Sequence, residues 1–185
     1  MTLQNRKTIH IFGASGSGAT TLAKAISEKY NYHFIDTDDA LWENTDPPFT
    51  VKKKEYESIK IVQNQLNAYT NNVISGAFVG WGDSFKTQID LFIYLHLPLE
   101  TRLKRIQTRE ENRFKERVLP GGDLYSQHQE FLAWVSQYEI LDESVRSQKQ
   151  HEKWLKNVKT TTLVIKEVLP LDDLLNRVKP FIELL

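Results

Sequence analysis

Glycines and a hydroxyl residue near the start of the chain have the types and the spacing that phosphate binding requires. Four residues separate Gly13 from Gly18, and Thr20 follows after one more, as in the Walker A pattern G-x-x-x-x-G-K-[ST]. The backbone N–H groups of such a loop converge on phosphate oxygens, and its hydroxyl binds Mg²⁺. Ala19 holds the position of the pattern's lysine. The indicated chemistry is the binding of ATP or another nucleoside triphosphate by a loop without its usual charge.

The alanine leaves three interpretations of this loop open. The loop is a glycine-rich turn that binds nothing, a phosphate site that has lost its chemistry, or a working site whose cation comes from another segment. The lysine normally neutralises charge on the β- and γ-phosphates, so its loss can cost orders of magnitude in rate. For a working site we expect nucleotide contacts at Gly13, Ala14, Ser15, Gly16, Ser17, Gly18, Ala19, Thr20 and Thr21.

Two carboxylates, Asp36 and Asp38, directly follow the second strand-like run. In an open parallel sheet, ligands gather at the carboxyl ends of the strands, so this pair is expected at the same cleft as the glycine loop. One carboxylate there can support magnesium, and the other can orient or deprotonate an acceptor hydroxyl. The alternative is a solvated turn or the N-cap of a following helix, a role that aspartate also serves.

Arginines recur at helical spacing later in the chain, at Arg102, Arg105, Arg109, Arg113 and Arg117. Arginine suits phosphate because its planar fork binds two oxygens and stays charged. We expect Arg109, Arg113 and Arg117 to supply the missing cation, because they run into a polar stretch, residues 110–123, that is typical of a lid. Arg146 is a weaker candidate. The alternative is an ordinary mixed-charge surface, since glutamates are interspersed among these arginines.

Strand-like and helix-like segments alternate along the chain and must position these residues. This order indicates an α/β layered domain with a mainly parallel sheet. The expected strands lie at residues 8–12, 32–35, 72–75, 91–95 and 161–165. The expected helices lie at residues 22–30, 59–69, 99–109, 131–138, 145–155 and 171–182. We expect one domain over residues 1–185, with the lid as an insertion.

Composition excludes several classes of function. The chain has 185 residues, of which 40% are hydrophobic and 26% charged, as in soluble globular domains. Its formal net charge is zero, which gives no general attraction to nucleic acid or to membranes, and we expect neither as a partner. The absence of cysteine excludes disulfides and thiol catalysis. The N-terminal residues have no signal-peptide core, and we expect a cytoplasmic monomer or homodimer.

Aromatic residues and histidines carry less information. Phe78 and Trp81 follow the third expected strand, where they either line an acceptor pocket or pack into the core. His128 and His151 have no partner at metal-ligand spacing, so we expect no zinc site.

The glycine loop, the segment F-I-D-T-D-D and the arginine series after L-F-I-Y-L together resemble small P-loop kinases of the shikimate kinase and adenylate kinase type. The segment F-I-D-T-D is most similar to shikimate and gluconate kinases. The stretch W-G-D-S-F and the run R-x-x-R-I are similar to bacterial adenylate kinase-like proteins and topology-modulation ATPases.

This resemblance implies the P-loop NTPase fold, a three-layer α/β/α arrangement with a five-stranded parallel sheet and an arginine-bearing lid. It also implies that Thr20 and Asp36 hold magnesium and that Asp38 meets the acceptor. The chain departs from the family pattern at three places. Ala19 replaces the lysine, the third strand ends in Ser75 without an acidic residue, and no arginine occurs between residues 41 and 80. The last departure argues against shikimate and against a nucleoside monophosphate site.

The function indicated first is a phosphotransferase that moves the γ-phosphoryl group of ATP, with Mg²⁺, to an unidentified small-molecule acceptor. Its catalytic residues would be Asp38 and the arginines of the lid. The alternatives are a nucleotide-binding regulatory protein with a degenerate loop, and a structural P-loop fold that binds no nucleotide. The hydroxyl of Thr20 and the aspartate pair favour the enzyme, whereas Ala19 favours the regulatory protein.

Overall fold

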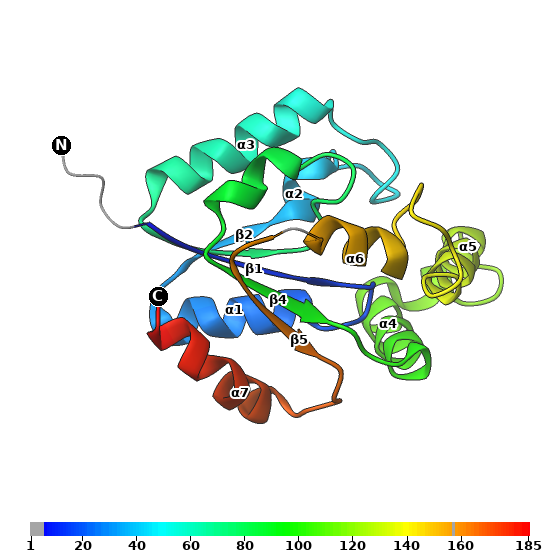
Figure 1. Ribbon diagram of the computed structural model, residues 1–185. Helices are drawn as coiled ribbons and strands as arrows, with labels where there is room; N and C mark the ends of the chain where they lie inside the picture. The colour runs from blue at the N-terminus through cyan, green and yellow to red at the C-terminus, as the bar shows by residue number, and fades with distance from the viewer. Residues whose placement is uncertain (1–5, 157) are drawn as a thin grey trace.

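A single sheet forms the centre of the computed structural model, which describes residues 6–156 and 158–185 (Figure 1). Residues 1–5, part of the segment that shows no signal-peptide core, lie outside this description, as does residue 157. The strands run parallel in the order β2-β3-β1-β4-β5. Their bounds are β1 (Lys7–Gly13), β2 (His33–Asp36), β3 (Asn71–Ser75), β4 (Leu91–Leu95) and β5 (Thr161–Ile165).

Helices cover both faces of the sheet and extend beyond its carboxyl edge. The α-helices are α1 (Ala19–Tyr30), α2 (Thr37–Leu41), α3 (Glu55–Ala68), α4 (Leu99–Phe114), α5 (Tyr125–Ser136), α6 (Gln148–Leu155) and α7 (Leu171–Glu183). Two 3₁₀ helices, η1 (Asp83–Gln88) and η2 (Lys115–Val118), complete the set. None of the described helices is both long and apolar enough to cross a membrane.

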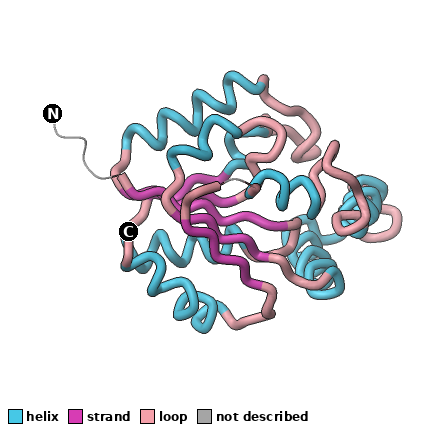
Figure 2. Tube along the Cα trace, in the orientation of Figure 1, coloured by secondary structure: helices cyan, strands magenta, loops and turns pink. Residues whose placement is uncertain are grey.

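Two apolar clusters join the helices to the sheet, one on each face. On one face, α1 and α7 pack against the sheet through residues such as Leu22 and Val178, both completely buried. On the other face, α3 and α6 pack through Val62 and Trp154. Every residue of β4 is buried, because this apolar strand is covered on both sides. These layers confirm the expected three-layer α/β/α arrangement (Figure 2).

Strand register brings the candidate residues to one edge of the sheet. Gly13 pairs with Leu95, and Asp36 pairs with Ser75, at the carboxyl ends of their strands. Helices α4 and α5 lie beyond this edge in Figures 1 and 2. The sheet therefore positions the glycine loop and the aspartate pair at the same end of the molecule, as expected from the parallel order.

The polar stretch 110–123 differs from the loop expected there. Helix α4 continues through residues 110–114, and η2 follows it directly. Arginine and glutamate favour helix, and Glu110 is buried, so this stretch holds its helical conformation beyond the sheet. The end of α4, η2 and α5, residues 110–136, are called the lid region below. Helix α2 begins directly after β2 with Asp36 as its N-cap, the alternative role that the aspartate pair offered.

Candidate functional site

The glycine loop joins β1 to α1 and has the backbone of a phosphate cradle. Gly16 and Gly18 adopt φ angles of 81° and 95°, which residues with a Cβ atom rarely adopt. A Cβ atom on Gly13 would lie 2.3 Å from the backbone oxygen of Leu95. One on Gly16 would lie 2.6 Å from the backbone oxygen of Arg102. The loop is thus held against β4 and α4 at positions where only glycine fits.

The N-terminus of α1 is open toward this loop. Gly18 is the N-cap residue and makes no side-chain capping hydrogen bond. The first N–H groups of a helix carry a partial positive charge, and anions bind there when no side chain caps them. The loop and the start of α1 therefore provide converging donors for a phosphate, as the sequence pattern predicts.

Ala19 is the first residue of α1 and contributes no charge to this cradle. Its side chain is partly buried and packs against the apolar cluster between the sheet, α1 and α7. Two arginines instead reach the loop. Arg105 donates from Nη1 to the backbone oxygen of Ser17 at 3.2 Å, and Arg146 donates from Nη2 to the backbone oxygen of Gly13 at 3.1 Å.

Arg146 has the surroundings expected of a phosphate ligand. Its Nε atom is buried and has no hydrogen-bond partner among the described residues. Its guanidinium lies 5.8 Å from the ring centroid of Trp134. Burial lowers the pKa of Arg146, and the nearby charge of Asp38 opposes that effect. Arginine stays protonated in proteins, so Arg146 brings a charge and an unused donor to the loop.

The three arginines that were expected to complete the site contact other side chains in this structure. Arg109 pairs with Glu110, 2.7 Å from Nη2 to Oε1. Arg113 lies over the ring of Phe49, with 5.3 Å from its Cζ atom to the centroid. Arg117 forms ion pairs with two aspartates of the surface. Catalytic roles for these three residues stay predictions.

The two arginines that contact the loop, Arg105 and Arg146, are not the three that the sequence pattern favoured. Arg105 lies one helical turn before Arg109 on the same face, and only three residues separate the end of β4 from the start of α4. The first turns of such a helix lie close to the sheet edge, and this proximity was the available signal. Arg146 has no comparable signal, because it precedes α6 in a polar segment and reaches the loop only through the tertiary fold.

Arg102 lies behind the glycine loop, with its backbone against Gly16 and its side chain buried. It is completely buried, donates from Nε to the backbone oxygen of Leu97 at 3.0 Å, and pairs with Glu139. Its guanidinium lies 5.3 Å from the ring centroid of Tyr138. A buried charge held by a carboxylate, a carbonyl and an aromatic ring fixes the start of α4. Because the backbone of Arg102 contacts Gly16, this anchor also fixes the glycine loop.

The acidic pair lies across β3 from the loop. Asp36 caps α2, accepting a hydrogen bond at Oδ1 from the backbone N–H of Asp38 at 3.0 Å. Burial raises the pKa of Asp36 to about 6, partly offset by that N–H donor. The Asp38 side chain is exposed. The N-cap, one of the alternatives left open for this pair, is therefore a structural role of Asp36, and its role toward magnesium stays a prediction.

Thr20 contacts β3, the strand that lies between the glycine loop and this pair. Its hydroxyl lies 3.3 Å from that of Ser75, the register partner of Asp36. The described residues contain no cluster of three or more His, Cys, Asp or Glu side chains able to hold a metal alone. Magnesium commonly takes one or two protein oxygens and completes its shell with water and phosphate oxygens. The hydroxyl of Thr20 and the half-buried carboxylate of Asp36, which accepts one N–H at Oδ1, fit that mode of binding.

The aromatic residues after β3 belong to the core. Phe78 is 1% exposed and packs in the cluster beneath α3 and α6, and Trp81 packs against that cluster. The Nε1 atom of Trp81 donates to the backbone oxygen of Ala77 at 3.0 Å. Core packing, one of the two alternatives left open, is therefore the structural role of Phe78. His151 is buried and its Nδ1 atom lies 2.5 Å from the hydroxyl of Tyr138.

Comparison with known proteins agrees with this geometry. A family model described as an AAA domain, AAA_18, matches residues 9–130. The chain is 35% identical over 177 residues to "Uncharacterized protein YqaC" of Bacillus subtilis (strain 168), covering 96% of this chain and 98% of that protein. It is 30% identical over 152 residues to a cytidylate kinase of Sulfolobus acidocaldarius, covering 74% of this chain and 80% of that protein.

A solved structure shows the same fold. The chain superposes on a shikimate kinase from Bacteroides thetaiotaomicron with a TM-score of 0.59, covering 96% of this chain and 98% of that one. The two sequences are 15% identical, so the likeness concerns the fold alone. Together, these matches confirm the resemblance to P-loop kinases that the glycine loop and the segments after β2 and β4 indicate.

Proposed function

The chain belongs to the AAA_18 family of AAA domains, and from this premise we propose that it is a P-loop phosphotransferase. It would move the γ-phosphoryl group of ATP, or of another nucleoside triphosphate, to a hydroxyl group of a small molecule. The cytidylate kinase relative supports a kinase reaction. The observation that carries the proposal is the hydrogen bond from Arg146 to the glycine loop. It supplies the positive charge that the lysine of the Walker A pattern would otherwise bring.

The nucleotide would bind at the glycine loop. Backbone N–H groups from Gly13 to Thr21 would hold the phosphates, aided by the open N-terminus of α1. Arg146 and Arg105, which donate only to carbonyl oxygens among the described residues, would add the cationic charge. Both arginines lie on segments that follow β4 in the chain, so the charge comes from outside the loop.

Mg²⁺ would be held by Thr20 and Asp36, with phosphate oxygens and water completing its shell. When bound, the ion neutralises charge that develops on the phosphates. The carboxylate of Asp36 is poised for this role because burial leaves its negative charge poorly solvated, so that a cation beside it is favoured.

Asp38 would serve the acceptor. Its carboxylate is exposed, and its charge opposes the effect of burial on the pKa of Arg146. In the reaction it would take the proton of the acceptor hydroxyl as the acceptor oxygen bonds to the γ-phosphorus. The bond from that phosphorus to the bridging oxygen breaks, and the nucleoside diphosphate leaves. In-line transfer of this kind depends mainly on positioning and on charge neutralisation, which these residues offer.

Nucleotide binding is tested by the thermal stability of the full chain with ATP, GTP, CTP and UTP, each with and without Mg²⁺. A nucleotide at a hundred times its Kd should stabilise the fold by about 2.7 kcal/mol. Phosphoryl transfer to each compound of a panel of hydroxyl compounds is then measured as the release of ADP from ATP. Binding without transfer to any compound would favour the regulatory alternative, which Ala19 supports. No stabilisation by any nucleotide would rule out both functions.

A further inference from the structure

Three buried polar side chains connect the segment that carries Arg146 to the sheet. The hydroxyl oxygens of Tyr94 and Tyr138 lie 2.9 Å apart, and the hydroxyl oxygen of Tyr138 lies 2.5 Å from Nδ1 of His151. Tyr94 belongs to β4, Tyr138 to the segment after α5, and His151 to α6. All three residues are buried, and together they are called the buried network. The proposed reaction uses none of them, so their hydrogen bonds call for another explanation.

The buried network is joined to Arg146 through the start of α6. Arg146 directly precedes Ser147, the completely buried N-cap residue of that helix. The backbone N–H of Gln148 donates to the backbone oxygen of Tyr138 at 2.9 Å, and the backbone N–H of His151 donates to that of Ser147 at 3.1 Å. The first turn of α6 is therefore held to Tyr138 by a backbone bond and by the His151 side chain, and Arg146 lies at the end of this turn.

The same network packs against the residue before the one that Arg146 contacts. The ring of Phe12 stacks on that of Tyr94, with 5.1 Å between the centroids, and meets the ring of His151 edge-on at 5.2 Å. Phe12 is followed by Gly13, whose backbone oxygen accepts the hydrogen bond from Arg146. The network thus holds both the segment of the donor, through α6, and the strand of the acceptor, through Phe12.

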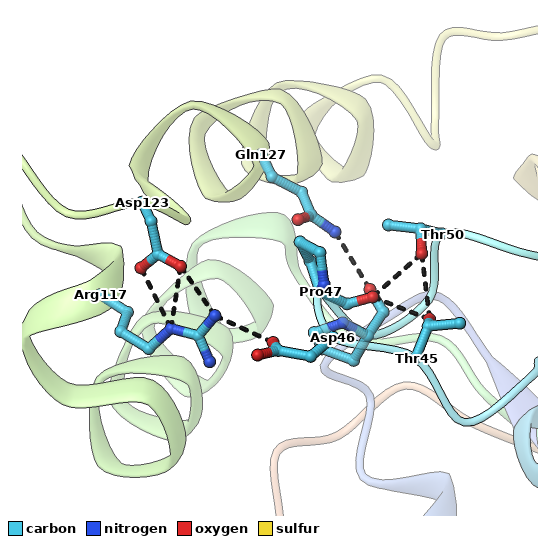
Figure 3. A network of polar contacts seen from close by, with 8 residues as sticks. Thr45, Asp46, Pro47, Thr50, Arg117, Asp123 and Gln127 are labelled. Atoms are coloured by element: carbon cyan, nitrogen blue, oxygen red, sulfur yellow. Dashed lines mark hydrogen bonds and ion pairs between the residues drawn. The ribbon is translucent and has the colours of Figure 1, made fainter.

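The side chain of Arg146 has few contacts of its own that could fix its position. Among the residues that the structure describes, Arg146 forms no ion pair, and its guanidinium lies against the ring of Trp134. Arg117 of the lid region is held differently, by ion pairs with Asp46 and Asp123 (Figure 3). Holding a long side chain in one place costs conformational entropy, so the position of Arg146 depends on how firmly its backbone is held.

We propose that Tyr138 and His151 are positioning residues for Arg146. The hydrogen bond between their side chains holds the first turn of α6, so that the guanidinium stays at the glycine loop where the phosphates would bind. The role of Arg146 toward phosphate rests on the proposed function, whereas the position of its side chain can be measured without nucleotide. Breaking the bond between Tyr138 and His151 should displace the guanidinium while the protein still folds.

The test uses two variants that each remove one hydroxyl group from the buried network. Tyr138→Phe breaks the link to His151 and keeps the ring that lies beside Arg102. Tyr94→Phe is the matched control, because it leaves the link between Tyr138 and His151 intact. The first readout is the Nε–H resonance of Arg146 in ¹⁵N NMR spectra of the nucleotide-free protein, identified by its loss in Arg146→Lys. We expect Tyr138→Phe to shift or broaden this resonance and Tyr94→Phe to leave it in place.

The second readout is kcat/KM for ATP, measured by ADP release. Tyr138→Phe should lower it about tenfold, because a small displacement of a positioned group is sufficient for such a loss. Tyr94→Phe should match the wild type. In the Arg146→Ala background, Tyr138→Phe should have little further effect, since the group that it positions is absent. A merely structural role would instead lower kcat/KM equally in both backgrounds.

His151 provides a second pair of variants, which keeps the test open if Tyr138→Phe does not fold. His151→Asn keeps a side-chain atom that can hydrogen-bond to Tyr138, whereas His151→Leu removes it. We expect His151→Leu to displace the Arg146 resonance and to lower kcat/KM as Tyr138→Phe does, and His151→Asn to retain most of the wild-type activity.

Two results would overturn the inference. One is an Arg146 resonance that stays in place when the bond between Tyr138 and His151 is broken. The other is an equal effect of Tyr94→Phe and Tyr138→Phe on that resonance and on kcat/KM. If calorimetry shows that the wild type binds no ATP, the proposed function is overturned instead, and the resonance of the nucleotide-free protein still decides whether the network positions Arg146.

Discussion

Arginines at the glycine loop and in the lid region have opposite electrostatic surroundings. At the glycine loop, Arg105 and Arg146 donate to backbone oxygens, and Arg146 keeps one buried donor unused. In the lid region, Arg117 is shared between two carboxylates. A neutral carbonyl leaves the charge of a guanidinium available to a phosphate, whereas a carboxylate cancels it.

This difference teaches that a count of arginines near a P-loop says little about phosphate binding. Sequence spacing drew attention to Arg109, Arg113 and Arg117, which form the most regular series. The structure gives those three residues partners of their own. The partner of each arginine, and not its position in a series, decides whether its charge is available to an anion.

The largest expected effect comes from removing the charge at the glycine loop. Arg146→Ala should lower kcat/KM for ATP by about 10²–10³-fold, because one charge aimed at a phosphoryl group during transfer has about that effect. Arg146→Lys should recover part of the loss, since it restores the charge without the planar fork. Both are measured by ADP release with a saturating acceptor, after circular dichroism has shown that the variants fold.

Lys104→Ala provides the matched control for this experiment. Lys104 is an exposed cation of α4, next to Arg105 in sequence, and it has no role in the proposed site. Its removal should leave kcat/KM within about twofold, as for most surface substitutions. If Arg146→Ala keeps wild-type activity while folded, the glycine loop has another source of charge and the contrast with the lid region is lost.

A smaller effect is expected at Asp36, where stability and magnesium binding should move in opposite directions. Its pKa is raised from 3.8 to about 6, so the native state binds more protons than the unfolded chain between these values. Stability contributed by this group therefore falls as pH rises from about 4 to 6, and remains lower above that range. Asp36→Asn keeps the cap of α2 and removes the charge, and should stabilise the protein at pH 8 by about 1–2 kcal/mol.

The same variant should weaken nucleotide binding only when Mg²⁺ is present. Urea unfolding at pH 5 and pH 8 measures the stability change, and thermal shifts with ADP, with and without Mg²⁺, measure the binding. Asp39→Asn serves as a control, because Asp39 is exposed and influences Asp36 only by weak repulsion. An Asp36→Asn protein that binds magnesium nucleotide as tightly as the wild type would remove Asp36 from the metal site.

Much of the fold could be predicted from the sequence because the signals were local. The run Leu91–Leu95 is apolar at every position, which indicates a central parallel strand, and α1 follows its glycine loop at once. Helix α2 gave no periodic signal, since it is five residues long. The continuation of α4 beyond residue 109 was missed because its polar composition resembles that of a loop, although glutamate and arginine favour helix.

The candidate site could be predicted only where its residues belong to one continuous segment of the sequence. The glycine loop and Asp36 depend on strand ends, which the pattern of a parallel sheet locates. The contact from Arg146 to Gly13 joins residues 133 positions apart, and the bond from Arg117 to Asp46 joins residues 71 apart. No periodicity in one sequence specifies such long-range pairs, so the tertiary structure was required to find which arginines contact the glycine loop.

The smallest expected effect is the most direct test of which group replaces the lysine. If Arg146 supplies that charge, a lysine at residue 19 is redundant in the wild type and useful only when Arg146 is absent. Ala19→Lys should therefore change ATP affinity by less than about threefold alone, but restore about tenfold in the Arg146→Ala background, a coupling of about 1–2 kcal/mol. Calorimetric titration of all four proteins with ATP and Mg²⁺ closes the double-mutant cycle. An equal gain in both backgrounds would mean that the two cations act independently, and that the loop lacks a charge which Arg146 does not replace.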